Sequence, residues 1–435
     1  MRAVIGVLIL LAVAWLLSTN RKSVDWKLVT AGVLLQILIA VSVLRIPLIR
    51  EFFDAAGAGV VRFLSFSAVG AEFLFGHLAR NSDAVQANHR LGFLFAFQAL
   101  PTVIFFSSVT AALYYLGVLQ KLVYGFAWIM ARTMRLSGAE SLSAAGNIFL
   151  GQTEAPLLVR PFIKDMTRSE LHCLMTGGMA TIAGSVMGAY ISFLGGTDPE
   201  ALARFATHLL CASMMNAPAA VVMAKIFLPE MKPHRINRNL HVPREAVGVN
   251  LIDALAKGAA DGLRLALNIG AMLLAFIAGI AAINWLLVEG LGSWTGLNDW
   301  VYRSTGGAFS GFSLEYLFGQ ALRWFALVMG VDWNESLAVG SLLGQKIVIN
   351  EFLAYSSLSE MKEVGTLSSR SILISTYALC GFANFSSIAI QVGGIGAMAP
   401  SRQSDLSQLG LRALVAASLA TMMSATIAGG LVDLS

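Results

Sequence analysis

The chain contains long, nearly uncharged apolar stretches, each of about the length that a helix needs to cross a lipid bilayer. Crossing the hydrocarbon core takes roughly 20 apolar residues, and a backbone in lipid must satisfy its own hydrogen bonds, as an α-helix does. A composition of 57% hydrophobic and 13% charged residues excludes an ordinary soluble globular domain. We interpret eight stretches as membrane-spanning helices: residues 3–19, 28–49, 91–117, 172–195, 205–228, 266–288, 371–393 and 409–432.

Three other stretches are apolar but are interrupted by glycine, proline or charged residues: 51–80, 137–162 and 309–357. Irregular backbone at membrane depth is tolerated only inside protein or beside a water-filled cavity. We therefore predict interfacial or re-entrant elements in these three places. The fold class that follows is an all-α polytopic membrane protein of about eight transmembrane helices.

The distribution of charge predicts an orientation in the membrane. The connector 229–257 is rich in basic residues, whereas the loops at 195–204 and 289–300 are mainly acidic. Because positively charged loops stay in the cytoplasm, we place the connector inside and the two loops outside, which puts both termini outside the cytoplasm. The net charge of +5 is explained by this arrangement, so we expect contact with membrane lipid and no nucleic-acid partner. The basic residues of the connector are Lys232, Arg235, Arg238, Arg244 and Lys257.

Cysteine and histidine show no spacing that is typical of a metal or catalytic site. The three cysteines, Cys173, Cys211 and Cys380, lie in apolar runs, and the six histidines form no HExxH pair. No nucleophile has an associated base. We predict that the chain is not an enzyme and expect no bound cofactor.

The two halves of the chain share a weak internal repeat. An acidic, glycine-punctuated stretch at 146–156 is followed some thirty residues later by Thr181-Ile182-Ala183-Gly184-Ser185, and 344–352 is followed at a similar distance by 380–387. Paired interrupted apolar segments are the best sequence indication of the substrate site in a transporter built from inverted repeats. We predict two re-entrant helical hairpins and two interrupted helices, with the second set inverted relative to the first.

Two glutamates, Glu154 and Glu351, lie in these apolar stretches. Placing an uncompensated carboxylate there costs at least ~2.5 kcal/mol, so each needs a partner or a function. One interpretation is structural: each carboxylate caps a hairpin tip, or Glu351 pairs with Lys346. The other is that both line a transport pathway, as carboxylates inside membranes usually do.

The polar residues near the two glutamates are uncharged hydrogen-bonding groups. Amides and hydroxyls both donate and accept, which suits a neutral, hydroxyl-rich solute better than an anion. Helix–helix hydrogen bonding is the alternative use of such groups. An aromatic ring, Phe382, stands at the second interruption and could stack on a planar heterocycle. The polar residues are Asn147, Gln152, Thr153, Thr181, Ser185, Asn350, Asn384, Ser386 and Ser387.

Residues 151–157 (GQTEAPL), 350–355 (NEFLAY) and 380–389 (CGFANFSSIA) look like the signature segments of the concentrative nucleoside transporter family in its short bacterial form. The likeness runs from about residue 90 to the C-terminus and includes 329–335. It implies a homotrimer in the bacterial inner membrane. Each protomer would have a scaffold and a moving transport part that carries both hairpins, in an elevator-type mechanism of alternating access.

The resemblance also implies roles for individual residues. The nucleobase would contact Gln152, Thr153, Glu154, Val186 and Phe382. The ribose hydroxyls would bind to Glu351, Asn384 and Ser387. A sodium ion would be held by the side chains of Asn147 and Thr181 and by the backbone carbonyls of Leu150, Thr181 and Ile182. The family often has serine where this chain has Thr181, which keeps the hydroxyl and adds a methyl group.

The spans and the resemblance together divide the chain into five parts. They are 1–90 (N-terminal transmembrane helices and an interfacial helix), 91–136 (a scaffold helix), 137–228 (the first repeat of the transport part), 229–335 (the cytoplasmic connector, a scaffold helix and an outer amphipathic region) and 336–435 (the second repeat).

We expect a secondary active transporter that imports uridine-like nucleosides by sodium symport. Proton coupling through Glu154 or Glu351 is an alternative, because some members of the family use protons, but the Asn147 and Thr181 pair favours sodium. A passive channel is a further alternative. It is disfavoured because channels usually repeat a filter around a symmetry axis, whereas the two half-sites here differ in chemistry.

Overall fold

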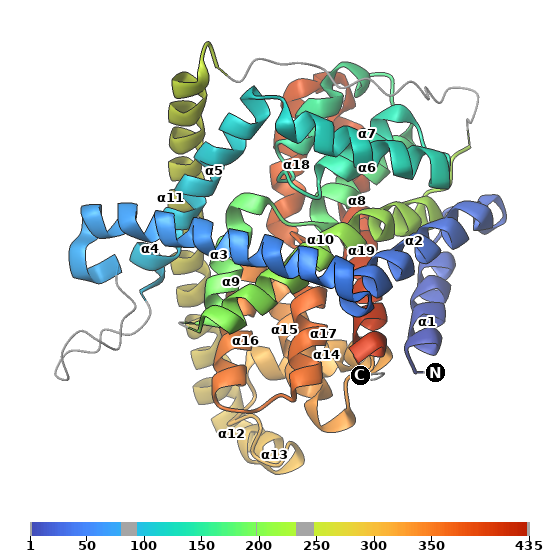
Figure 1. Ribbon diagram of the computed structural model, residues 1–435. Coiled ribbons are helices and arrows are strands. Elements are labelled where there is room, and N and C mark those ends of the chain that lie inside the picture. The colour runs from blue at the N-terminus through green and yellow to red at the C-terminus, as the bar shows by residue number, and fades with distance from the viewer. Residues whose placement is uncertain (1, 80–93, 197, 232–247, 433–435) are drawn as a thin grey trace.

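The computed structural model describes residues 2–79, 94–196, 198–231 and 248–432, and every regular element in these ranges is a helix (Figure 1). This confirms the predicted all-α class. Seven helical segments in the described part of the chain are long and apolar enough to cross a bilayer. Most of the basic residues of the predicted cytoplasmic connector, from Lys232 to Arg244, lie outside the described residues, as does the beginning of the expected span 91–117.

The N-terminal part contains the first two expected spans and a long crossing helix. Its elements are α1 (Arg2–Leu16), η1 (Arg21–Ser23), α2 (Trp26–Arg45), α3 (Pro47–Phe75), η2 (Gly76–Ala79), α4 (Phe95–Gln98), α5 (Leu100–Tyr115) and α6 (Val118–Met134). In Figure 1, α3 runs crosswise to the upright α11.

The first repeat is a hairpin, an interrupted helix and a continuous helix. The elements are α7 (Gly138–Gly146), the 3₁₀ helix η3 (Ala155–Phe162), α8 (Arg168–Ala180), α9 (Gly184–Gly195) and α10 (Pro199–Phe227). The second repeat has the same order: α15 (Trp333–Val348), α16 (Glu351–Glu363), α17 (Ser369–Leu379), α18 (Phe385–Met398), η6 (Pro400–Arg402) and α19 (Gln403–Val432). Between them lie α11 (Leu251–Asn284), the π-helix η5 (Trp285–Gly292), α12 (Ser293–Thr295), α13 (Leu297–Ser304) and α14 (Leu314–Met329).

The repeats are inverted, as predicted. In Figure 1 the hairpin α7–η3 and helix α8 lie in the upper half of the molecule, whereas α15, α16 and α17 lie in the lower half. The second half of each interrupted helix lies on the opposite side from the first: α9 follows α8 in the lower half, and α18 follows α17 in the upper half. The two interruptions therefore meet near the middle of the molecule.

A direct backbone contact joins the two interruptions. The Phe382 N–H donates to the Thr181 carbonyl at 3.2 Å. Gly381 makes this approach possible, because a Cβ at that position would lie 2.7 Å from the Ala180 carbonyl oxygen and 2.9 Å from a methyl of Thr421. Only glycine lets two unwound segments cross so closely without strain.

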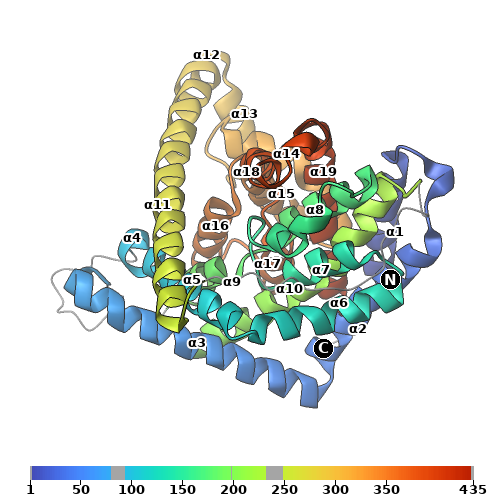
Figure 2. The ribbon, with the colours of Figure 1, turned by 90° about the horizontal axis from the view of Figure 1, so that it is seen from above.

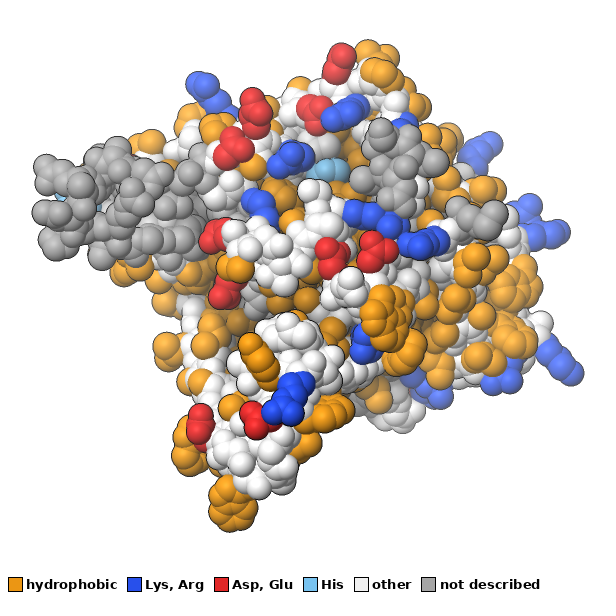
Figure 3. Space-filling view, turned by 90° about the horizontal axis from the view of Figure 1, so that it is seen from below, with side chains coloured by type: hydrophobic (Ala, Val, Ile, Leu, Met, Phe, Trp, Pro, Cys, Tyr) orange, Lys and Arg blue, Asp and Glu red, His pale blue; other side chains and the backbone are white. Residues whose placement is uncertain are grey.

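The helices differ in what they contact. Of the most apolar stretch of α10, 89% is buried inside the protein, whereas none of that of α11 is. Figure 2 shows α11 at one side of the molecule next to α5, with α3 along the edge. Figure 3 shows charged side chains scattered over the lower face, including several at its margins, with hydrophobic side chains gathered along parts of its edge. The repeats thus form a buried block, and α3, α5 and α11 present apolar surface outward.

The three stretches predicted to hold interfacial or re-entrant elements have different structures. In the first, 51–80, α3 is continuous to Phe75 and runs crosswise to α11, as an interfacial helix would (Figure 1). Its Gly57 marks a close crossing, since a Cβ there would lie 2.8 Å from the Ala203 carbonyl of α10. In 309–357, α14 is a whole helix packed on α15, where a Cβ at Gly340 would lie 2.7 Å from the Gly319 carbonyl. The stretch 137–162 forms the first predicted hairpin, and the end of 309–357 forms the second, where α15 meets α16. At Gly57 and Gly340, glycine serves helix packing.

Replacing Gly381 by alanine should separate the two interruptions. Inserting a methyl group into such a site typically costs about 1–3 kcal/mol, so Gly381→Ala should lower the melting temperature of the purified protein. Gly393→Ala is the matched control, because nothing lies within 4 Å of a Cβ at that position in α18. Equal melting temperatures for the two variants would contradict the close crossing.

Candidate functional site

The first hairpin places its polar residues in a compact turn. A capping box of Ser137 and Glu140 begins α7, and the helix ends before residues 147–154, which form the tip. The Gly184 N–H donates to the Phe149 carbonyl at 3.0 Å, which ties this tip to the first interruption. The Glu154 carboxylate lies directly against Gly151, so a side chain at that position would displace it. The sequence that interrupts the helix therefore also positions the glutamate.

Glu351 is held by two neutral donors. It is 2% exposed, and its Oε1 accepts from the Tyr190 hydroxyl at 2.9 Å while its Oε2 accepts from Asn384 Nδ2 at 3.0 Å. Asn384 also caps α18, because its Oδ1 accepts from the Ser387 N–H at 2.9 Å. Tyr190 stacks on Tyr355 with ring centroids 4.6 Å apart, which fixes its hydroxyl. The carboxylate is thus oriented from α9 and from the second interruption together.

Lys346 has other partners than Glu351. Its Nζ donates to the Ala378 carbonyl at 2.7 Å and to Thr421 Oγ1 at 2.9 Å. In the described part of the chain, no ion pair links Lys346 to Glu351. The geometry does not support the hypothesis that the glutamate serves to bind this lysine.

The expected base-binding and ribose-binding residues are in contact across the two repeats. Gln152 Nε2 donates to Ser387 Oγ at 3.0 Å, so the first hairpin touches the first turn of α18. Thr153 and Glu154 are exposed, Phe382 is half-buried, and Val186 is buried. The structure therefore joins Gln152 with Ser387 and Glu351 with Asn384, and leaves faces of Thr153, Glu154 and Phe382 accessible.

Two of the residues expected to bind sodium, Asn147 and Thr181, lie beside Gly177. Asn147 is 1% exposed, and neither atom of its amide has a hydrogen-bond partner among the described residues. Thr181 Oγ1 donates to the Gly177 carbonyl at 2.9 Å, and a Cβ at Gly177 would lie 3.1 Å from Asn147 Nδ2. Leaving a buried amide unsatisfied costs roughly 1–3 kcal/mol. An oxygen-seeking cation on Asn147 Oδ1 would remove part of that cost, so the residues fit the ion.

No cluster of His, Cys, Asp and Glu that could hold a metal ion is found within the described ranges. The ligands expected at Asn147, Thr181, Leu150 and Ile182 are an amide, a hydroxyl and backbone carbonyls. Such neutral, unwound-helix ligands are those that transporters use for monovalent cations.

The sequence analysis missed two side chains, Tyr190 and Gln391. Each lies one helical turn beyond a residue that it identified: Tyr190 follows Val186 at i+4, and Gln391 follows Ser387 at i+4. Residues four apart share a helix face. The helical period, applied to the expected site residues, would have found both.

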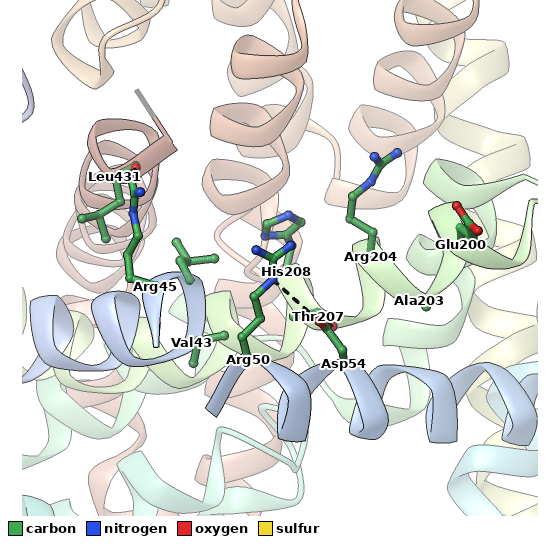
Figure 4. Close-up of a pocket in the computed structure, with 11 residues that line it drawn as sticks. Val43, Arg45, Arg50, Asp54, Glu200, Ala203, Arg204, Thr207, His208 and Leu431 are labelled. Atoms are coloured by element: carbon green, nitrogen blue, oxygen red, sulfur yellow. Dashed lines mark hydrogen bonds and ion pairs between the residues drawn. The ribbon is translucent and has the colours of Figure 1, made fainter. Parts of the chain in front are cut away.

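A cavity of about 550 Å³ lies elsewhere, where the end of α2 and the start of α3 meet α10 (Figure 4). None of the expected site residues lines it. Arg50 pairs with Asp54 at 3.7 Å, and Asp54 also accepts from Thr207 Oγ1 at 3.1 Å. Because carboxylates face the guanidinium groups, we assign this cavity no part in the site.

The fold and the site define a secondary transporter, because inverted hairpins and interrupted helices meet around a polar centre inside a membrane protein. Family models described as "Na+ dependent nucleoside transporter" match residues 5–78 for the N-terminus and 208–429 for the C-terminus, and one described as "Nucleoside recognition" matches 96–197. The chain belongs to the family of Na⁺-dependent nucleoside transporters.

Relatives and solved structures agree with this membership. An "uncharacterized transporter" of Haemophilus influenzae is 39% identical over 98% of this chain and 96% of its own length. Sodium/nucleoside cotransporter 1 of Mus musculus is 40% identical over 98% of this chain, which spans 62% of that protein.

Solved structures of the transporter CNTnw cover nearly the whole chain. A variant in an outward-facing state has a TM-score of 0.87 at 38% identity, covering 100% of this chain and 98% of that one. An inward-facing substrate-bound state has a TM-score of 0.85 at 39% identity, with 98% of both chains covered. The fold of this chain is thus similar to both ends of an alternating-access cycle.

Lys346 and Glu351 should act independently in stability measurements. Lys346→Met removes the donors to Ala378 and Thr421, so it should lower the melting temperature. Glu351→Gln in the same chain should not restore it. The measurement is thermal unfolding of the two single variants and the double variant. A double variant more stable than Lys346→Met alone would indicate that the two charges compensate each other after all.

Proposed function

We propose that the chain imports uridine-like nucleosides by sodium symport. The observation that carries this proposal is the contact of both hairpins with both interruptions around neutral donors, two carboxylates and an unsatisfied buried asparagine. A nucleoside is neutral, rich in hydroxyls and carries a planar base. Each of these properties has a counterpart in the site.

The ribose end of the site is proposed at Glu351, Asn384 and Ser387. An ionised carboxylate accepts from two vicinal hydroxyls, and each hydrogen bond to a charged group contributes roughly 1.5–3 kcal/mol, against about 1 kcal/mol for a neutral pair. Glu351 has no cation bound to it, and its present partners are neutral. Ribose hydroxyls could therefore bind to the carboxylate and be selected by it.

The base end is proposed at Gln152, Thr153 and Glu154, with Phe382 and Val186 as apolar contacts. Gln152 supplies an amide, which can pair with a heterocycle edge. The accessible face of Phe382 suits stacking on a planar ring.

Sodium is proposed to bind at Asn147, Thr181 and the carbonyls of Leu150, Thr181 and Ile182. The Thr181 carbonyl accepts from the Phe382 N–H, so the proposed ion site and the substrate site share a peptide group. An ion that orders this group improves the shape of the nucleoside site, and by linkage each ligand raises the affinity for the other.

Transport is proposed to follow an elevator mechanism. The buried block of hairpins, interrupted helices, α10 and α19 would move against a scaffold of α3, α5 and α11. The apolar exposed surface of α11 suits contact with lipid or with a second protomer, in line with a homotrimer. We propose the bacterial inner membrane as the location, with both termini outside the cytoplasm.

Two alternatives, proton-coupled symport and a passive channel, can be distinguished from sodium symport by experiment. Proton coupling would use Glu154 or Glu351 as the carrier. A passive channel would need a continuous water path and would not concentrate its solute. Neither is favoured by a specific contact in the described residues.

Concentrative uptake should depend on sodium. In proteoliposomes at fixed pH, replacing external sodium by choline should abolish accumulation of labelled uridine. Asn147→Leu should raise the sodium concentration for half-maximal uptake by roughly tenfold or more, because it removes one ion ligand. A protonophore should not abolish sodium-driven accumulation, although it removes the part that the membrane potential contributes. Uptake that resists choline but stops with the protonophore would place coupling on a carboxylate.

Uridine should be carried far better than free uracil. Uracil leaves Glu351 and Asn384 without partners, and a site built around hydroxyls rejects analogues that lack them. Glu351→Gln keeps the shape but loses the charge, so uridine should bind about tenfold more weakly, as measured by titration of the purified protein. Glu289→Gln, at an exposed position in η5, is the matched control. Unchanged affinity in Glu351→Gln would remove Glu351 from the ribose site.

A further inference from the structure

A buried glutamine, Gln391, lies directly behind Gln152. It is on α18, one turn after Ser387, and is 1% exposed. Its Nε2 lies 3.2 Å from Gln152 Oε1 and 3.2 Å from the Met175 carbonyl oxygen. Its own Oε1 has no hydrogen-bond partner among the described residues, so these two contacts are what hold the amide.

These contacts determine which way both amides point. Oxygen and nitrogen of an amide are usually assigned from their surroundings, and here the surroundings include a peptide carbonyl, which only accepts. The atom of Gln391 that faces Met175 must therefore be its NH₂ group. Since the same NH₂ group also faces Gln152, the atom of Gln152 beside it must be the carbonyl oxygen. The NH₂ group of Gln152 is left pointing to the other side, where it donates to Ser387 Oγ at 3.0 Å.

We propose that Gln391 is a positioning residue that fixes the amide orientation of Gln152, so that Gln152 offers the nucleobase a donor and not an acceptor. This inference rests on the proposed function and adds a substrate class to it. A donor at this position pairs with a keto oxygen, such as that of uracil. It meets another donor in the amino group of cytosine. Nucleosides whose base presents a keto oxygen to Gln152 are then bound better than those that present an amino group.

Gly178 provides a second, independent control of the same amide. A Cβ at this position of α8 would lie 2.6 Å from Gln391 Nε2 and 3.1 Å from Gln152 Cβ. Gln391 cannot keep both hydrogen bonds beside that methyl group. The missing side chain at Gly178 thus leaves the space in which the two glutamines meet.

The simpler interpretation is that Gln391 only bonds α18 to α8. The two interpretations differ in what a substitution changes. Loss of a helix–helix bond lowers uptake of every nucleoside by the same factor. Loss of amide orientation lets Gln152 turn over, which changes the ratio of uridine to cytidine.

The test is the ratio of kcat/KM for uridine to that for cytidine, measured by uptake into proteoliposomes in saturating sodium. Gln391→Met should narrow the preference for uridine by roughly tenfold, because the mismatch of one buried hydrogen bond is relieved. Gln391→Glu should move the ratio further toward cytidine, because a carboxyl oxygen accepts from the Gln152 NH₂ group and turns the Gln152 carbonyl to the base. Gly178→Ala should narrow the uridine-to-cytidine ratio as Gln391→Met does, although neither glutamine is substituted.

The matched control is Gln36→Met, which removes a fully buried glutamine of α2 that donates to the Gly32 carbonyl. Its ratio should equal that of the unsubstituted protein. If Gln391→Met lowers uridine and cytidine uptake equally, Gln391 is only a structural contact and the inference is wrong. If Gln391→Met fails to assemble, Gly178→Ala decides in the same way. If the unsubstituted protein carries no nucleoside, the proposed function fails and this inference falls with it.

Discussion

The hydrogen bond between the two interrupted helices is the constraint on which the rest of the site depends. The Phe382 N–H and the Thr181 carbonyl belong to different repeats. Each lies where a helix is interrupted and its regular backbone hydrogen bonds are missing. Backbone groups without partners are costly inside a membrane, so each interruption satisfies the other. The polar side chains around them are brought together because the unwound segments must cross.

Because the unwound segments cross, each repeat contributes different polar residues to the same centre. The first repeat contributes Asn147, Thr181 and Gln152, and the second contributes Glu351 and Asn384. A charged residue is held from both sides: Tyr190 comes from the first repeat and Asn384 from the second. The carboxylate therefore keeps its position only while the two repeats stay together. In the transport mechanism proposed above, both repeats would have to move as one block.

The sequence predicted helix interruptions well where buried polar groups need partners. It predicted them less well at glycine, which can either interrupt a helix or allow two helices to pack closely. The interruptions near Thr181 and Phe382 could be predicted because isolated glutamates and amides in apolar runs demand partners. The packing roles of Gly57 in α3 and Gly340 in α15 could not be predicted, because a glycine in a sequence looks the same whether it breaks a helix or lets one helix cross another. Gln391 was missed because it lies inside a regular helix. Lys346 binds to Ala378 and Thr421, which lie in distant segments that no local sequence pattern connects to it.

The ligands proposed for sodium at Asn147 are all neutral, and this has an electrical consequence. A cation held only by amide, hydroxyl and carbonyl oxygens brings its whole charge into the moving block, because no carboxylate there cancels it. Carried with a neutral nucleoside across the membrane potential, one such charge gains about 2.3 kcal/mol per 100 mV. That corresponds to roughly fiftyfold accumulation. A cell with a polarised membrane could thus draw the solute inward through voltage alone, even where sodium is equal on the two sides.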